Sequence, residues 1–191
     1  MASQHGILFL IALLLCGCLQ SDEDTGTDTA DTSTDKAATG DQPFAGVVPP
    51  AFIKVTITDW NNQHVDLGEL RGDQPALVVF IGATCPYCAA FLELIAEHWA
   101  TFEGRLVFMI ISLDDSTTTK LQHLRNKFPF TFYIDNREIL AEKYGYIGQV
   151  PYTVFINRHG KLIRREVGFT EENGPIFLRL FEEVIADDTP L

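Results

Sequence analysis

The chain has 191 residues, of which 46% are hydrophobic and 21% are charged, a globular balance that excludes disorder throughout. The formal net charge of −12 argues against nucleic-acid binding through a basic surface. No apolar run reaches the roughly 18 residues that a transmembrane helix needs, which excludes a protein with several membrane spans. Four cysteines are too few for a disulfide-stapled miniprotein.

The first segment is typical of a cleaved leader. Residues 7–15 form an unbroken apolar run that ends in small residues, as in a secretory signal. The following cysteines make the segment 15–18 resemble the bacterial lipobox, which implies that residues 1–17 are a signal peptide and that Cys18 carries the lipid. A plain secretory leader or an uncleaved signal anchor is the alternative, because residues 1–6 contain no Lys or Arg.

The next segment, residues 18–44, is rich in Ser, Thr, Asp, Gly and Ala. Acidic residues far outnumber its one base, Lys36. Such a composition buries too little apolar surface to offset chain entropy, so we expect a disordered acidic tether. Calcium binding is a weaker interpretation, because the spacing of an EF-hand loop is absent.

Residues 45–191 carry the periodicity of one folded domain. Strands are expected at 54–58 and 64–67, which form a hairpin, and then at 76–81, 106–111, 130–134, 152–156 and 162–167. Helices are expected at 86–102, 116–128, 135–144 and 172–186, the third of them started by Asp135 and Glu138 as a capping box. Strand–helix alternation predicts an α/β fold in which helices flank a mixed central sheet with an extra N-terminal hairpin.

The chemistry is expected at Cys85-Pro86-Tyr87-Cys88, which directly follows a buried strand and opens a helix. Two intervening residues in a first helical turn bring two sulfurs within bridging range. Cys85 lies where free backbone N–H groups and the helix dipole stabilise a thiolate, so it is the expected nucleophile. Cys88 should be more buried and should resolve the mixed disulfide. Pro86 suits the first turn, and Tyr87 is expected to be exposed beside Cys85 and to touch substrate.

Two other uses of the cysteine pair stay open. A structural zinc site needs two more ligands, and the remaining cysteines, Cys16 and Cys18, belong to the leader. A purely structural disulfide would close a loop of a few residues and stabilise little. We therefore expect no metal, and no cofactor other than the redox-active Cys85–Cys88 pair.

Residues 45–191 resemble thioredoxin-fold proteins of the TlpA, or AhpC/TSA redoxin, type. The motifs that carry the resemblance lie at 65–72, 79–88, 111–115 and 144–153, the last followed by a strand and by 158–161. The resemblance implies that the Val150–Pro151 bond is cis, that it lies beside the cysteines, and that this loop offers backbone groups to a substrate peptide.

Two departures from the family pattern concern the redox site. The Trp that usually precedes the first cysteine is Thr84 here. The buried Asp of true thioredoxins, six residues before the first cysteine, is Val79, which removes the usual acid/base for Cys88. Nearby, Asp114 and Asp115 follow a strand and precede a helix, so we interpret both as capping residues.

The resemblance implies a membrane-tethered, extracytoplasmic thiol–disulfide oxidoreductase, favoured as a reductase. Its implied partners are protein thiols and disulfides, an upstream membrane electron donor or acceptor, and a bacterial membrane, with the outer membrane favoured by Leu19 after the lipid anchor at Cys18.

Three alternatives are kept for the function. A peroxiredoxin-like peroxidase would have Thr three residues before its cysteine, where this chain has Gly82. Copper delivery of the Sco type is less favoured, because that motif has three residues between its cysteines and a distant His ligand. A binding domain of the same fold with idle cysteines is the non-enzymatic alternative.

Overall fold

The computed structural model describes residues 50–191, so the expected signal peptide, the tether and Cys18 lie outside the described residues. The strands are β1 Thr56–Asp59, β2 His64–Asp66, β3 Ala76–Ile81, β4 Val107–Ser112, β5 Phe132–Ile134, β6 Tyr152–Ile156 and β7 Leu162–Val167. The helices are α1 Leu67–Arg71, α2 Pro86–Glu97, α3 Trp99–Phe102, α4 Thr119–Lys127, α5 Ile139–Lys143 and α6 Gly174–Ala186, with a 3-10 turn at Glu171–Asn173.

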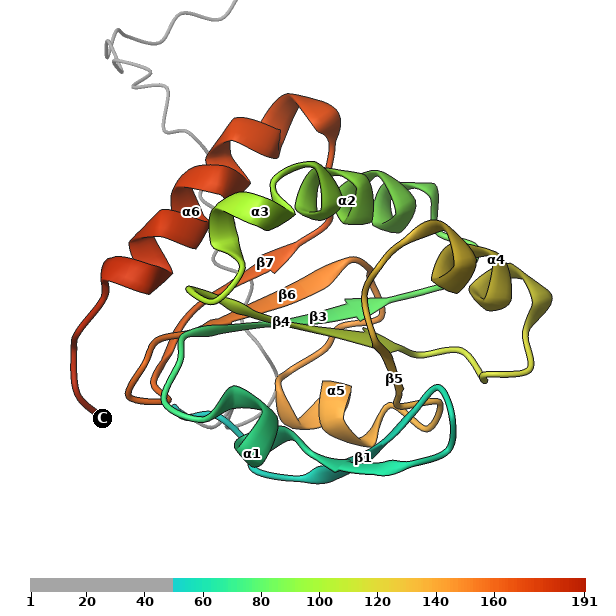
Figure 1. Ribbon diagram of the computed structural model, residues 1–191, viewed down its shortest axis with the longest axis horizontal. Coiled ribbons are helices and arrows are strands. Elements are labelled where there is room, and N and C mark those ends of the chain that lie inside the picture. The colour runs from blue at the N-terminus through green and yellow to red at the C-terminus, as the bar shows by residue number, and fades with distance from the viewer. Residues whose placement is uncertain (1–49) are drawn as a thin grey trace, which may run out of the picture. The chain divides into compact units, whose positions relative to one another are not determined.

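The seven strands form one mixed sheet in the order β2-β1-β5-β4-β3-β6-β7. Helices α2, α3, α4 and α6 cover one face, and α1 and α5 cover the other (Figure 1). This arrangement confirms the expected α/β class with its N-terminal hairpin, since β1 and β2 pair antiparallel. Within residues 50–191, no helix has the length and apolar character that crossing a bilayer requires.

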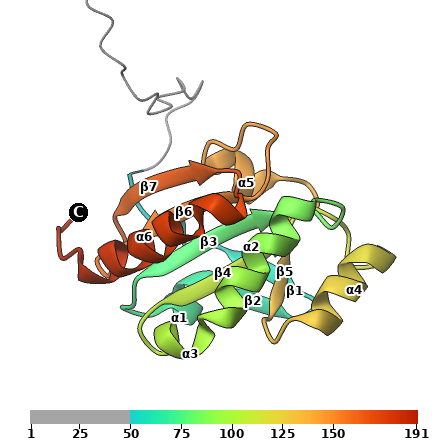
Figure 2. The ribbon, with the colours of Figure 1, turned by 90° about the horizontal axis from the view of Figure 1, so that it is seen from above.

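Strand β3 lies inside the sheet between β4 and β6, and all six of its residues are buried. Leu77, Val79 and Ile81 face the core under α2 and α6, whereas the alternate residues face the core under α5. Helices α2 and α6 lie side by side over the sheet (Figure 2), and Phe91 of α2 meets Phe177 of α6 with ring centroids 4.8 Å apart. This packing fixes the direction of α2 and therefore the position of its first turn.

The direction of β6 places a second segment at the same edge of the sheet. Strand β4 runs parallel to β3, but β6 runs antiparallel to it, with Tyr152 opposite Phe80. The segment that enters β6 therefore lies at the carboxyl end of β3, next to the start of α2.

Several helix boundaries differ from those expected. The expected helix 86–102 divides at His98, whose φ of −100° and ψ of 8° leave the helical region. The expected start of a helix at 116 moves to Thr119, because the backbone N–H and hydroxyl of Thr117 both donate to the Asp115 carboxylate. The short α1 was not expected; Asp66 caps it by accepting the N–H groups of residues 68 and 69.

The capping box expected at Asp135 and Glu138 is also wrong in its spacing. The Asp135 carboxylate accepts the N–H groups of Leu140 and Ala141, each at 2.9 Å. Glu138 is left-handed with a φ of 56°, so α5 begins only at Ile139. The acid caps the helix, but it does so across a turn that the sequence pattern does not reveal.

Candidate active site

Cys85 is the N-cap residue of α2, in an extended conformation with φ −84° and ψ 113°. Its sulfur accepts the backbone N–H of Cys88 at 3.1 Å. Pro86 occupies the first turn, where a missing N–H leaves no bond unmade. An N–H donor and the positive end of a helix dipole both favour negative charge on the Cys85 sulfur.

Cys88 lies one turn further into α2 and is completely buried. Burial raises the pKa of the Cys88 thiol far above its usual value, and the hydrogen bond with Cys85 acts in the same direction. Cys88 is therefore a protonated thiol at neutral pH, whereas the Cys85 sulfur is partly exposed. Both side chains are free thiols in the structure.

The loop before β6 completes the surroundings of Cys85. The Val150–Pro151 peptide bond is cis, as the family resemblance implies. The Cys85 thiol donates to the Val150 carbonyl at 3.5 Å, across 65 positions of sequence. Pro151 is itself buried, whereas Val150 is partly exposed, so Val150 is the member of this pair that an incoming chain meets.

A close approach of backbones brings these elements together at Gly82. A Cβ atom at this position would lie 3.4 Å from Val150 Cγ2 and 3.9 Å from Cys85 Cβ. These are ordinary van der Waals distances, so Gly82 marks where the cis-peptide loop and the start of α2 come close together.

Asp114 is a member of the site that the sequence analysis missed. It follows β4, and its Oδ2 accepts the N–H of Ala83 at 2.5 Å. Interpreting Asp114 as a helix cap is therefore wrong, whereas Asp115 does hold the turn at Thr117. The signal was available in the predicted topology, because parallel strands β3 and β4 end at the same edge of the sheet.

A groove of about 470 Å³ lies beside Cys85, between the first turn of α2 and α4. Its surface is mostly apolar. The exposed side chains of Lys120 and His123 stand on its α4 side. The exposed Tyr87 is not part of this groove; it is 57% exposed in the turn between the cysteines. The groove thus places an apolar surface next to Cys85.

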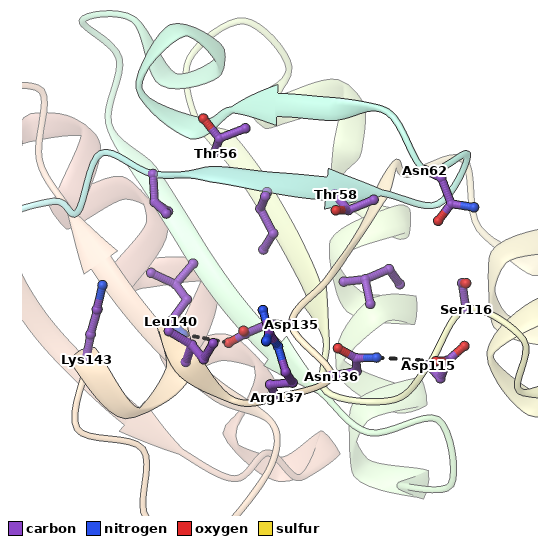
Figure 3. A pocket seen from close by; sticks show the side chains of 14 residues that line it. Thr56, Thr58, Asn62, Asp115, Ser116, Asp135, Asn136, Arg137, Leu140 and Lys143 are labelled. Carbon is purple, nitrogen blue, oxygen red and sulfur yellow. Dashed lines mark hydrogen bonds between the residues drawn. The ribbon is translucent and has the colours of Figure 1, made fainter.

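A second cavity, of about 430 Å³, lies between β1 and the segment from β5 to α5. Its lining includes polar and charged side chains such as Thr58, Asn62, Arg137 and Lys143 (Figure 3). Neither cysteine lines it, although Asp115 does. Among residues 50–191, no group of three or more His, Cys, Asp or Glu side chains is arranged to hold a metal ion.

Comparison with known proteins identifies the family of the chain. The AhpC/TSA family model matches residues 49–165, more than half of the chain. No curated protein matches the chain.

Solved structures similar to the chain include three bacterial redox proteins. One is described as a candidate thiol:disulfide interchange protein DsbE from Chlorobium tepidum, with 17% identity and a TM-score of 0.63 over 73% of this chain and 99% of that one. Mycobacterium tuberculosis DsbF has 20% identity and a TM-score of 0.60, covering 72% and 99%. The peroxidoxin BcpB of the same species has 17% identity and a TM-score of 0.59, covering 72% and 96%.

At these identities the structural likeness shows the fold, and the matched family shows the relationship. The chain therefore belongs to the AhpC/TSA family and is a thioredoxin-like oxidoreductase.

Proposed function

We propose that the protein is an extracytoplasmic, membrane-tethered thiol–disulfide oxidoreductase that reduces disulfides in other proteins through Cys85 and Cys88. The observation that carries this proposal is the pairing of an N-cap thiol, Cys85, with the carbonyl of Val150 and with a buried second thiol three residues on. The Cys85 sulfur is partly exposed and can attack a substrate, and the Cys88 sulfur is buried next to it.

The proposed reaction has two exchange steps. The Cys85 thiolate attacks one sulfur of a substrate disulfide, so a Cys85–substrate disulfide forms and the other substrate sulfur leaves as a thiolate. Cys88 then loses its proton and attacks the Cys85 sulfur, which releases the second substrate thiolate and leaves a Cys85–Cys88 disulfide. The substrate gains two electrons, and a membrane electron donor must return two to the protein.

The substrate that fits this site is an extended segment of a protein. The apolar groove beside Cys85 offers contact without selecting polar groups, and the partly exposed Val150 is next to the attacking sulfur. The name DsbE borne by one similar structure supports disulfide exchange as the reaction class.

The reduction potential of the Cys85/Cys88 pair tests the proposed direction. The protein is equilibrated in thiol/disulfide buffers, and the fraction of alkylated Cys85 and Cys88 is measured by mass spectrometry. A value near that of thioredoxin, about −270 mV, supports a reductase, whereas a value near that of DsbA, about −120 mV, would reverse the direction. Absence of any reversible couple would favour the binding-domain alternative.

The tether is tested at Cys18. Expression with a labelled fatty acid should label the wild type, and Cys18→Ala should remove both the label and the membrane fraction. Cys16→Ala is the matched control, because the lipobox resemblance assigns the lipid to Cys18 alone. Label retained by Cys18→Ala would contradict this proposal.

A further inference from the structure

The second exchange step needs a base that the strand beneath the cysteines does not provide. Cys88 is a buried, protonated thiol, and it cannot attack the mixed disulfide until its proton leaves. Val79 of β3, where thioredoxins have a buried Asp, is apolar and fully buried. The proton therefore has to leave through another group at this edge of the sheet.

Asp114 reaches this position from the neighbouring strand. Its Oδ2 is tied to the Ala83 N–H at 2.5 Å, and the same oxygen lies 3.8 Å from the point where a Gly82 Cβ would be. The same point lies 3.9 Å from Cys85 Cβ, and the charge of Asp114 acts on the Cys88 thiol. Gly82 therefore lies between this carboxylate and the cysteine that opens α2.

The carboxylate is held firmly and has a route to water. The backbone N–H of Asp114 donates to the buried Ser112 hydroxyl at 3.0 Å, and that hydroxyl donates to the Asp114 carbonyl at 3.2 Å. Oδ2 is the Asp114 oxygen that lies near Gly82, and it is fixed there by the Ala83 N–H. Asp114 is only partly buried, so a proton received there can pass to solvent.

We propose that the Asp114 carboxylate accepts the proton of Cys88 as Cys88 attacks the Cys85–substrate disulfide. The proton moves from Cys88 Sγ through a water molecule to the Asp114 carboxylate, the new Cys85–Cys88 bond forms, and the substrate sulfur leaves with the electron pair of the broken bond. This inference rests on the proposed function and deepens it, since it assigns the proton acceptor of the second step.

Two effects of the same carboxylate act in opposite directions, which makes the inference testable. As a negative charge, Asp114 raises the pKa of Cys88 and so disfavours its thiolate, in addition to the larger effect of burial. As a base, it speeds removal of the proton. The other titratable groups that act electrostatically with Cys88 are Cys85 and Tyr146. Removing the charge at Asp114 therefore speeds the second step if Asp114 is only a charge, and slows it if Asp114 is the base.

The experiment uses the full chain with Cys16 and Cys18 changed to Ser, so that Cys85 and Cys88 are its only thiols. The reduced protein is mixed with the aromatic disulfide DTNB, which releases one coloured thiolate when Cys85 attacks and a second when Cys88 resolves the mixed disulfide. Asp114→Asn keeps the size of the side chain and an oxygen for the Ala83 N–H, but it cannot accept the proton. Asp115→Asn removes the adjacent charge and is the matched control.

We expect Asp114→Asn to slow the second release by roughly 10²-fold at neutral pH and to leave the first release within about twofold. Its second release should rise about tenfold per pH unit, because hydroxide replaces the lost base. Asp115→Asn should change neither step, and Asp114→Glu should recover part of the second rate. The unchanged first release shows that the variant site is folded.

A second release in Asp114→Asn that equals or exceeds the wild-type rate would overturn this inference and leave the proposed function intact. A wild-type protein that gives the first release but never the second would overturn both, because no internal disulfide would then form.

Discussion

Cys85 and Cys88 lie one helical turn apart at the start of α2, but Cys85 is partly exposed and Cys88 is fully buried. Cys85 precedes the helix, accepts an N–H and contacts the partly exposed Val150 of the cis-peptide loop. Cys88 follows one turn later and is sealed between the helix and β3. The difference shows that a separation of one helical turn is enough to make one of two identical side chains the nucleophilic thiol and the other the resolving thiol.

The largest effect is expected from removing the cysteines one at a time. Cys85→Ser should lower the reduction of insulin by more than roughly 10³-fold, because the nucleophile is lost. Cys88→Ser should also stop turnover, but it should accumulate a Cys85–substrate disulfide that is visible on a non-reducing gel. Trapping by Cys85→Ser instead would reverse the assigned roles.

The buried side of α2 is tested by the free energy of unfolding rather than by activity. Phe91→Ala should lower the free energy of unfolding by about 3–5 kcal/mol, because Phe91 is fully buried against Phe169 and Phe177. Tyr87→Ala, on the exposed side, should change it by less than about 0.5 kcal/mol. Urea unfolding of the two variants measures both values, and equal losses would contradict the contrast between the two sides.

The burial of Cys88 is tested by measuring the free energy of unfolding as a function of pH. The folded state raises the pKa of Cys88, so above the ordinary thiol pKa of about 8.5 only the unfolded chain releases this proton. Stability of the reduced Cys85→Ser protein should therefore be complete below that pH and fall by about 1.4 kcal/mol per unit above it. The double variant Cys85→Ser/Cys88→Ala is the reference, and an identical pH dependence in both would refute the expectation.

The smallest effect is expected at the edge of the groove beside Cys85. Lys120→Glu should slow reduction of an acidic peptide disulfide by roughly 2–5-fold at low salt, with the difference lost at high salt. Asn126→Glu, on the same helix but outside the groove, should have a smaller effect. Equal effects of the two variants would mean that the charge acts from a distance and not in the groove.

The sheet and the cysteine motif could be predicted because each has a local signal. The unbroken apolar run of β3 predicts a strand that is buried on both faces. The Cys-Pro-Tyr-Cys segment after it favours redox chemistry over a zinc site or a structural disulfide. The roles of Cys85 and Cys88 and lipid attachment at Cys18 stay predictions that the variants above test. Contact of Pro86, Tyr87, Val150 and Pro151 with substrate stays a prediction as well. The structure adds that residues 85–88 lie within one turn and that Val150 meets Cys85.

The features that were missed depend on contacts between distant residues. The break at His98 lies inside an apolar, helix-like stretch, and the following Trp99 packs between Phe108 and Phe130 of other segments. Asp114 looks like any acid before a helix until β3 and β4 are aligned side by side. Capping statistics describe neighbours in sequence, and both errors arose where a neighbour in space decided the outcome.

The separation of Cys85 and Val150 in the sequence also sets the order in which the site can be assembled during synthesis. The ribosome makes Cys85 and Cys88 long before it makes Val150, which lies 65 positions after Cys85. Until β6 pairs with β3, the Val150 carbonyl is not in place beside the Cys85 sulfur. The cysteine pair is therefore the early part of the site in synthesis, and the contact with the cis-peptide loop is the late part.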